Sequence, residues 1–304
     1  MLTAAIAQLR PEPGSLSRTL DKLADAVADA RKAGAAIVAT GETSLPGYPA
    51  WIDHCPGAFL WDSEPTKTVF ARYRRESVEV PGPATERMGA IARDAGLVLV
   101  AGVSERVATG PGSLTLYNSL LTFDADGRLV NHHRKLVPTY TERTVWGQGD
   151  ERGLRAVDTA AGRIGGLVCW EHWMPLARQA LHESHELIHT AVWPTVHDKH
   201  QLASRHYALE GRCFVLAVGQ ILLAEDLPDE LEKGPDAGPE DLILRGGSAI
   251  LGPDGAYLAE PVFDREALLL ARIDPSAVDR EAMTLDVSGH YSRPDVFRFE
   301  VRRR

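Results

Sequence analysis

The sequence predicts one α/β domain over residues 1–304, built from two mixed β-sheets with helices on the outside. Its beginning alternates strand and helix: an apolar run at Leu2–Leu9, an amphipathic helix between Ser15 and Gly34, and a second apolar run at Ala35–Thr40. This order is typical of parallel strands joined by a crossover helix. The pair Asp126-Gly127 between two later strand-like runs is a hairpin signal. Parallel units and hairpins in one chain therefore predict mixed sheets.

The other elements follow from similar patterns. Ser15 can cap the first helix with its hydroxyl, and Gly34 can end it. Further helices are expected at Ala84–Ala95, at about Trp173–His182, at Asp198–Gly211 and from Pro275 onward. Further strands are expected at Leu97–Val103, Leu114–Phe123, Arg128–Arg134, Leu154–Asp158, Arg163–Val168, Leu187–Val192, Cys213–Val218, Gly247–Leu251, Tyr257–Pro261 and Ala267–Ile273. We expect Glu225–Glu240, rich in Asp, Glu, Gly and Pro, to be an exposed loop within the domain, because strand signals resume after it.

Composition and charge exclude several classes of protein. Hydrophobic residues make up 44% of the chain, so a large core can be buried. The formal charge of -9 disfavours nucleic acid or an anionic membrane surface as the main partner. Three cysteines without a C-x-x-C pair argue against a disulfide framework or a zinc ribbon and favour a reducing compartment. Signal-peptide and membrane-span patterns are not evident, so we expect a cytoplasmic protein.

Three reactive residues come at the ends of expected strands. Glu42 follows Ala35–Thr40, Lys135 follows Arg128–Arg134, and Cys169 follows Arg163–Val168. The carboxyl ends of strands form the ligand crevice in open α/β sheets, so this placement can bring the three together. Glu42 could then accept the thiol proton of Cys169, and the ammonium of Lys135 could stabilise negative charge that develops on the attacked group.

Each of these residues also has a plainer interpretation. A cysteine after a strand is more often a small buried hydrophobe, and a glutamate or lysine in a loop is usually a solvated charge. The surrounding sequence favours catalysis. Three ordered motifs resemble those of nitrilases: Gly41–Pro49 (GETSLPGYP), His133–Thr139 (HRKLVPT) with Glu142-Arg143 and Trp146–Asp150 (WGQGD), and Gly166–Arg178 (GLVCWEHWMPLAR). Further matches are Ala191–Thr195 (AVWPT), Glu210–Val215 (EGRCFV) and Gly289–Asp295 (GHYSRPD).

The resemblance covers essentially the whole chain and implies a four-layer αββα sandwich. It also implies the catalytic residues Glu42, Lys135 and Cys169, with Glu142 beside the lysine in an orienting or proton-transfer role. No metal or organic cofactor is implied. The partners implied are a small-molecule nitrile and a second copy of the chain. We expect a homodimer or higher homo-oligomer, and because the sequence stops at Arg304, soon after the last motif, we do not expect long spirals.

The resemblance implies hydrolysis of an organic nitrile through a thioimidate and a thioester on Cys169. Aromatic residues crowd the motifs, and although many will pack in the core, those near the site favour a bulky apolar nitrile such as an arylacetonitrile. The expected substrate-binding residues are Tyr48, Thr139, Trp146, Trp170, Trp173, Trp193 and Pro194.

Three alternatives remain open at this stage. An amidase or carbamoylase of the same superfamily shares the reactive residues, although the flank Trp170–Pro175 and the spacing around Glu142 resemble the nitrilase branch. A metal hydrolase would use the clustered histidines, but their spacing matches no ligand motif, and we expect them on the surface or in supporting positions. A catalytically inactive homologue used for assembly or binding is the third. The histidines are His182, His185, His189, His197, His200 and His206.

Overall fold

The computed structural model describes residues 1–234 and 238–302. In this part of the chain, fourteen strands form two seven-stranded mixed sheets. The first sheet contains β1 (Leu2–Gln8), β2 (Ile37–Ala39), β3 (Val78–Glu79), β4 (Val98–Arg106), β5 (Leu116–Phe123), β6 (Leu129–Arg134) and β14 (Ala267–Ile273). The second contains β7 (Val157–Thr159), β8 (Gly162–Val168), β9 (Ile188–Val192), β10 (Phe214–Val218), β11 (Ile221–Leu223), β12 (Leu242–Leu251) and β13 (Tyr257–Phe263).

Parallel and antiparallel pairs coexist in both sheets. The first sheet runs in the order β14-β1-β2-β4-β5-β6, with β3 paired to β4. Its β1, β2 and β4 are parallel, whereas β14, β5 and β6 pair antiparallel with their neighbours. The second sheet runs in the order β11-β12-β10-β9-β8-β7, with β13 paired to β12. The prediction of two mixed sheets is therefore confirmed.

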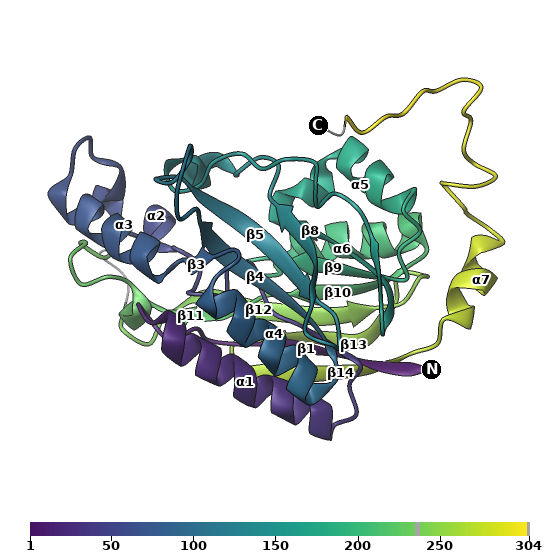
Figure 1. Cartoon of the computed structure of the whole chain (residues 1–304), viewed down its shortest axis with the longest axis horizontal. Helices are drawn as coiled ribbons and strands as arrows, with labels where there is room; N and C mark the ends of the chain where they lie inside the picture. Colours follow the sequence, from purple (N-terminus) through teal and green to yellow (C-terminus); the bar gives the residue numbers. More distant parts are fainter. Residues whose placement is uncertain (235–237, 303–304) are drawn as a thin grey trace.

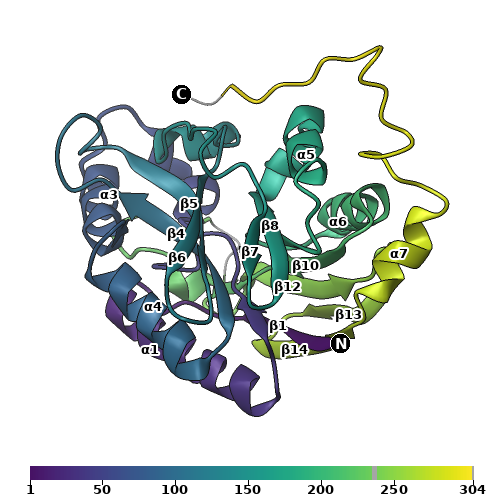
Figure 2. The same ribbon diagram turned by 45° about the vertical axis from the view of Figure 1, so that its right-hand side comes forward.

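Helices cover the outer face of each sheet. Figure 2 shows α1 (Leu16–Lys32) and α4 (Pro83–Ala95) on one side of the molecule, and α5 (Pro175–His182) and α6 (Asp198–Gly211) on the other. Figure 1 shows the ribbon coloured along the sequence from the N-terminus. After α7 (Ser276–Ala282), a final segment extends away from the sheets. The expected four-layer αββα arrangement is confirmed.

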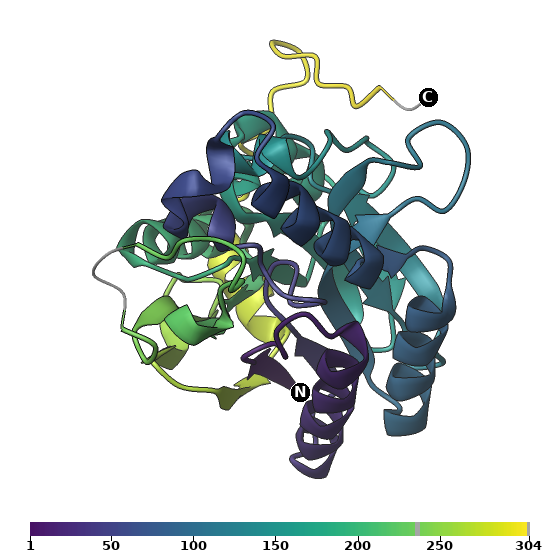
Figure 3. The ribbon, with the colours of Figure 1, turned by 90° about the vertical axis from the view of Figure 1, so that its left-hand side faces the viewer.

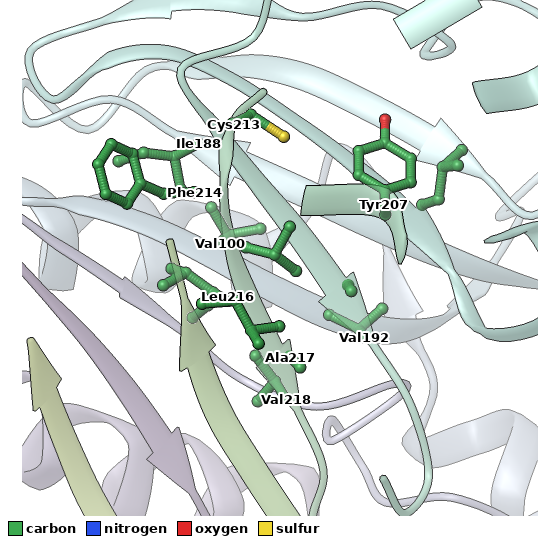
Figure 4. Packing of buried hydrophobic residues seen from close by; sticks show 14 of the residues in the cluster. Val100, Ile188, Val192, Tyr207, Cys213, Phe214, Leu216, Ala217 and Val218 are labelled. Atoms are coloured by element: carbon green, nitrogen blue, oxygen red, sulfur yellow. The ribbon is translucent and has the colours of Figure 1, made fainter. Parts of the chain in front are cut away.

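Alternation of side chains along the strands explains the layers. In β1, Ala4 and Ile6 lie in the core between the sheets, whereas Ala5 and Ala7 lie in the core beneath the helices. Successive side chains of a strand point to opposite faces, so a strand buried on both faces must be apolar throughout. Figure 4 shows Val100 of the first sheet beside Leu216 of the second, where the two inner faces pack together.

The sequence pattern did not predict the helical segment between β2 and β3. It contains α2 (Trp51–His54), a 3-10 helix at Pro56–Phe59 and α3 (Glu64–Glu76), which lie together on one side of the molecule in Figure 1 and face the viewer in Figure 3. Val69 is the only residue of α3 that is fully buried, and the rest of the helix is strongly charged, so it lacks the apolar stripe that identifies a helix in a sequence.

The expectation of an exposed loop at Glu225–Glu240 is wrong for part of that segment. Leu227 and Leu231 are buried in a cluster with Trp51 and Trp146, and Ala224–Asp226 forms a 3-10 helix. Residues 235–237 of the segment lie outside the described residues. Two buried leucines in a polar stretch are too few to give a periodic signal, so the packing could not be inferred from the pattern. Among the described residues, none of the helices combines the length and the apolar character needed to span a bilayer.

Gly102 lets the chain after β2 lie directly on β4. A Cβ added there would lie 2.7 Å from the backbone N of Thr43 and still closer to the carbonyl O of Gly41. A side chain at this position would therefore push the segment that carries Glu42 away from the sheet.

We expect Gly102→Ala to lower the free energy of unfolding by about 1–3 kcal/mol, as overpacking usually does. Urea denaturation measures this change. Gly57→Ala is the matched control, because a Cβ there would meet no atom within 4 Å. Equal stability of the two variants would contradict the close approach.

Candidate active site

The three predicted reactive residues lie together in the interior. Glu42 follows β2, Lys135 follows β6 and Cys169 follows β8, and each side chain is almost completely buried. One carboxylate oxygen of Glu42, one of Glu142 and the Sγ of Cys169 all lie within 4.8 Å of one another. The two sheets therefore bring these loops together at one edge, as the placement after strands predicts.

Lys135 joins the two carboxylates. Its Nζ donates to Oε1 of Glu42 at 2.9 Å and to Oε2 of Glu142 at 2.7 Å. Burial opposes the charged form, but the negative charge of Cys169 when it is ionised, and those of Glu42 and Glu142, outweigh burial and raise the pKa of Lys135 well above its ordinary value. Lys135 is therefore an ammonium group next to the thiol.

Glu42 has one occupied and one free carboxylate oxygen. Its Oε1 accepts from Lys135 and, at 2.6 Å, from Nδ2 of Asn118. Its buried Oε2 has no hydrogen-bond partner. Burial raises the pKa of Glu42 to about 7, although the charge of Lys135 acts in the opposite direction. A carboxylate with this pKa can exchange a proton near neutral pH, and Oε2 is the atom available to do so.

The backbone of Glu42 is also fixed. Its carbonyl oxygen accepts from Nε2 of Gln220 at 2.5 Å, and its N–H donates to the carbonyl oxygen of Trp193 at 3.3 Å. Trp193 follows β9 and Gln220 follows β10, so both bonds tie the loop after β2 to the second sheet. Sequence reasoning did not identify Asn118 or Gln220, since single amides within apolar runs give no catalytic signal.

Glu142 is held from three directions. Besides Lys135, its Oε2 accepts from the backbone N–H of Thr139 at 2.7 Å, and its Oε1 accepts from the hydroxyl of Tyr48 at 3.1 Å. It lies in the 3-10 helix Tyr140–Thr144. Glu142 thus fixes the position of the Lys135 ammonium.

Cys169 occupies a tight turn directly after β8. Its φ of 55° lies in the left-handed region, which is unusual for a residue with a side chain. A strand that turns sharply into a helix presents the nucleophile at the end of the sheet. Burial, followed by the charge of Glu42, raises the pKa of the Cys169 thiol well above its ordinary value. The thiol therefore needs a base to become a nucleophile.

Glu171 connects the cysteine turn to the lysine loop. Its carboxylate accepts from the backbone N–H of Val168 at 2.7 Å, from that of Leu136 at 2.8 Å, and from Nε2 of His133 at 3.0 Å. Burial opposes its charge, but the charge of His133 and these N–H donors outweigh burial and keep the pKa of Glu171 below its ordinary value. Sequence reasoning gave Glu171 no separate role, although it lies inside the cysteine motif.

A pocket of about 280 Å³ opens next to Cys169. Of the seven expected substrate-binding residues, four line it: Tyr48, Thr139, Trp170 and Pro194. Glu142, Tyr140, Thr195, His197, His200 and Leu244 are among the other lining residues. A second cavity of about 420 Å³ shares Tyr48 and Ala50 with this pocket, but Cys169 does not line it.

The other three expected pocket residues lie outside this lining. Trp193 is fully buried and stacks between His172 and His200, with ring centroids 4.7 and 4.4 Å away. Trp146 is buried against Tyr48, with ring centroids 5.9 Å apart. Trp173 is partly exposed beside Trp170. Tryptophans near a motif can thus support the site without lining the pocket.

Among the described residues, one group of metal-ligand type is present, and it consists of Glu42, Glu142 and Cys169. The Lys135 ammonium already supplies a positive charge to both carboxylates. This donor set therefore fits proton transfer rather than a divalent ion.

Comparison with known proteins agrees with this geometry. The model of the carbon-nitrogen hydrolase family matches residues 3–281. An aliphatic nitrilase of Sinorhizobium fredii (strain HH103) is 37% identical over 98% of this chain and 94% of its own length. A nitrilase 2 from an unknown prokaryotic organism is 39% identical over 99% of this chain and 93% of its own length. A bifunctional nitrilase/nitrile hydratase of Nicotiana tabacum is 37% identical over 93% of this chain and 81% of its own length.

Solved structures share the fold at lower identity. A carbon-nitrogen hydrolase from Helicobacter pylori G27 has a TM-score of 0.71 and 20% identity, over 93% of this chain and 92% of that chain. A mutant of the amidase from Nesterenkonia sp. AN1 has a TM-score of 0.68 and 19% identity, over 93% of this chain and 98% of that chain. Both likenesses support the four-layer architecture.

We expect Glu171→Gln to lower the free energy of unfolding by about 2 kcal/mol or more, because an amide NH₂ would face backbone N–H donors that need an acceptor. Chemical denaturation followed by circular dichroism measures this loss. Glu183→Gln is the control, since Glu183 is exposed and its Oε1 accepts from Nε2 of Gln179 at 3.0 Å on the surface. A Glu171→Gln variant as stable as that control would argue against the connection between the two loops.

Proposed function

The chain belongs to the carbon-nitrogen hydrolase family, and from this premise we propose that it is a nitrilase that converts an organic nitrile and two waters into a carboxylic acid and ammonia. The observation that carries the proposal is the buried thiol of Cys169 beside the free Oε2 of Glu42 and the Lys135 ammonium. The names of the relatives that are 37–39% identical support nitriles as the substrate class.

The first half of the reaction forms a thioimidate. Oε2 of Glu42 accepts the thiol proton, and the sulfur of Cys169 attacks the nitrile carbon. The nitrile nitrogen gains negative charge as its triple bond becomes a double bond, and it receives the proton that Glu42 took from the thiol. The Lys135 ammonium and the backbone N–H of Trp170 stabilise the charge on nitrogen while it develops.

The second half uses two waters. Glu42 accepts a proton from the first water as the water oxygen adds to the thioimidate carbon, and passes this proton to the nitrogen. The nitrogen then takes the proton of the new hydroxyl and leaves as ammonia, which gives a thioester. The second water adds in the same way, the carbon–sulfur bond breaks, and the acid departs with the proton returned to the thiol. Lys135 keeps its charge throughout, because Glu42 and Glu142 hold it on both sides.

The pocket supports a substrate with an apolar group next to the nitrile. Tyr48, Trp170, Pro194 and Leu244 offer apolar surface within about 280 Å³. We therefore propose an arylaliphatic or other bulky apolar nitrile. The relative named an aliphatic nitrilase favours an aliphatic nitrile as the competing substrate.

Amide is a second proposed product. After the first water adds, the tetrahedral carbon can expel either ammonia or the sulfur of Cys169, and expulsion of sulfur releases the amide. The relative from Nicotiana tabacum named as both nitrilase and nitrile hydratase favours this branch. Protonation of the nitrogen decides the ratio, since only the protonated amine is a good leaving group.

A panel of aliphatic, aromatic and arylaceto nitriles, with ammonia and amide both quantified, tests the proposal. We expect ammonia to be the main product, with the highest kcat/KM for an arylacetonitrile, and Cys169→Ala to abolish turnover. Cys213→Ala is the control, because Cys213 is buried in the core away from the pocket. Ammonia release by Cys169→Ala, or faster turnover of the matching amide than of the nitrile, would refute the assignment.

The rate should also depend on the charge of Glu42. Its raised pKa of about 7 means that the carboxylate becomes protonated as pH falls through that value, so kcat/KM should decline on the acid side. We expect Glu42→Gln to lower kcat/KM at pH 8 by about 100-fold or more, which is the usual contribution of a general base. A Glu42→Gln enzyme with the wild-type rate would rule out this role.

A further inference from the structure

Four buried side chains form a hydrogen-bonded chain behind Cys169, which we call the histidine network: His172, His189, Glu186 and Tyr207. Nδ1 of His172 lies 2.7 Å from the carbonyl oxygen of Cys169. Nε2 of His172 lies 2.9 Å from Nε2 of His189, and Nδ1 of His189 lies 2.9 Å from Oε2 of Glu186. The hydroxyl of Tyr207 donates to Oε1 of Glu186. Figure 4 shows Tyr207 of α6 among the packed residues of this core.

The number of protons that the hydrogen bonds require determines the protonation state of the histidine network. A carbonyl oxygen can only accept, so Nδ1 of His172 must carry a proton. The contact between the two rings and the contact from His189 to Glu186 need one proton each. Three hydrogen bonds thus require three protons, whereas two neutral imidazoles supply only two. The histidine network therefore holds one further proton, either on Glu186 or on an imidazole.

Burial decides where this proton lies. All of the groups are excluded from water, so the arrangement without separated charges is the cheaper one. Burial lowers the pKa of His172 and of His189 well below the ordinary value, and it raises the pKa of Glu186 to about 7. Each group then donates a hydrogen bond to the next one: Tyr207 to the protonated Glu186, Glu186 to His189, His189 to His172, and His172 to the carbonyl of Cys169.

The surroundings support a neutral carboxyl at Glu186. A Cβ at Gly165 of β8 would overlap Oε2 of Glu186. The glycine, which has no side chain, therefore leaves space for the carboxyl group of Glu186. Glu171, in contrast, meets only N–H donors and is ionised. The titratable or charged groups that face the histidine network are His133, Glu171, Arg178, His182, Glu210 and Cys213.

The last hydrogen bond of the histidine network holds the peptide bond between Cys169 and Trp170. The carbonyl of Cys169 and the N–H of Trp170 belong to one planar trans peptide, so they point in opposite directions. The bond from His172 to this carbonyl consequently fixes the direction of the Trp170 N–H. In the proposed function, that N–H stabilises the charge on the substrate nitrogen.

We propose that His172, His189 and Glu186 are positioning residues that orient the Trp170 N–H, and that they do so only while the histidine network holds its extra proton. The proposal rests on the proposed function for its catalytic readout. When the proton is lost at higher pH, one of the three hydrogen bonds must fail. If both rings change tautomer, the hydrogen bond from Nδ1 of His172 to the carbonyl oxygen of Cys169 is the one that is lost, because Nδ1 then carries no proton.

Glu186→Gln tests the proposal, because a glutamine amide mimics the protonated acid. Its NH₂ can donate to His189 while its oxygen accepts from Tyr207, and it has no proton to lose. We expect Glu186→Gln to keep kcat within about twofold of the wild type below pH 7 and to remove a decline of kcat that the wild type shows above it. Glu186→Met, which is similar in size and cannot donate, should lower kcat about 10-fold or more with little change in KM, since the lost stabilisation concerns the transition state.

Two kinetic outcomes would overturn the proposal. If Glu186→Gln loses as much activity as Glu186→Met, then Glu186 acts as an anion. If Glu186→Gln keeps the wild-type decline at high pH, then the titrating group lies elsewhere. Thermal unfolding of each variant shows whether it is folded, and the Gln variant alone decides the question if the Met variant does not fold.

A measurement without substrate separates this proposal from the proposed function. In ¹⁵N-histidine-labelled Cys169→Ala protein at pH 6, we expect the signals of His172 and His189, assigned with His172→Asn and His189→Asn variants, each to show one protonated and one unprotonated ring nitrogen. An imidazolium with two protonated nitrogens at either residue would overturn the neutral arrangement, whatever the enzyme hydrolyses. Neutral rings together with no nitrile turnover would refute the proposed function alone.

Discussion

The ammonium of Lys135 between two buried carboxylates is the interaction on which the site depends. Removing any of these three charges from water is costly, and their attraction compensates only if the geometry is close to ideal. The 2.9 and 2.7 Å bonds from Nζ to Glu42 and Glu142 meet this requirement. The negative charges keep the lysine protonated, and the lysine in turn keeps Glu42 from becoming a fully neutral acid. Chemistry near neutral pH follows from this balance.

The architecture places three loops next to one another. Two sheets face each other, and the loops after β2, β6 and β8 meet at one edge. Each loop is then fixed by bonds that cross between elements: Gln220 holds the backbone of Glu42, and Glu171 joins the turn at Cys169 to the residue after Lys135. Cys169 lies in a left-handed turn, a conformation that persists only where the surrounding structure holds it in place.

Strands and reactive residues were predictable because they leave local signals. Apolar runs such as Leu97–Val103, which lies largely within β4, identify strands whatever their partners, and reactive side chains directly after strands point to one edge of a sheet. Helix α3 was not predictable because its surface is charged and it packs through very few buried residues. Asn118, Gln220 and Glu186 were missed for a different reason. Asn118 and Gln220 contact Glu42, which lies 76 and 178 positions away, and Glu186 joins nearby His189 to Tyr207, which lies 21 positions away. No local pattern records these distant contacts.

Three buried glutamates show why residue type alone does not give a role. Glu171 accepts from three N–H groups and is an anion; Glu186 meets a ring nitrogen that needs a donor and is an acid; Glu42 has one oxygen on Lys135 and one without a partner. Burial acts on all of them in the same direction, so the difference comes from the donors and acceptors that each carboxyl meets. Glu42 is the one placed beside the thiol of Cys169, where the oxygen without a partner, Oε2, can take a proton and return it.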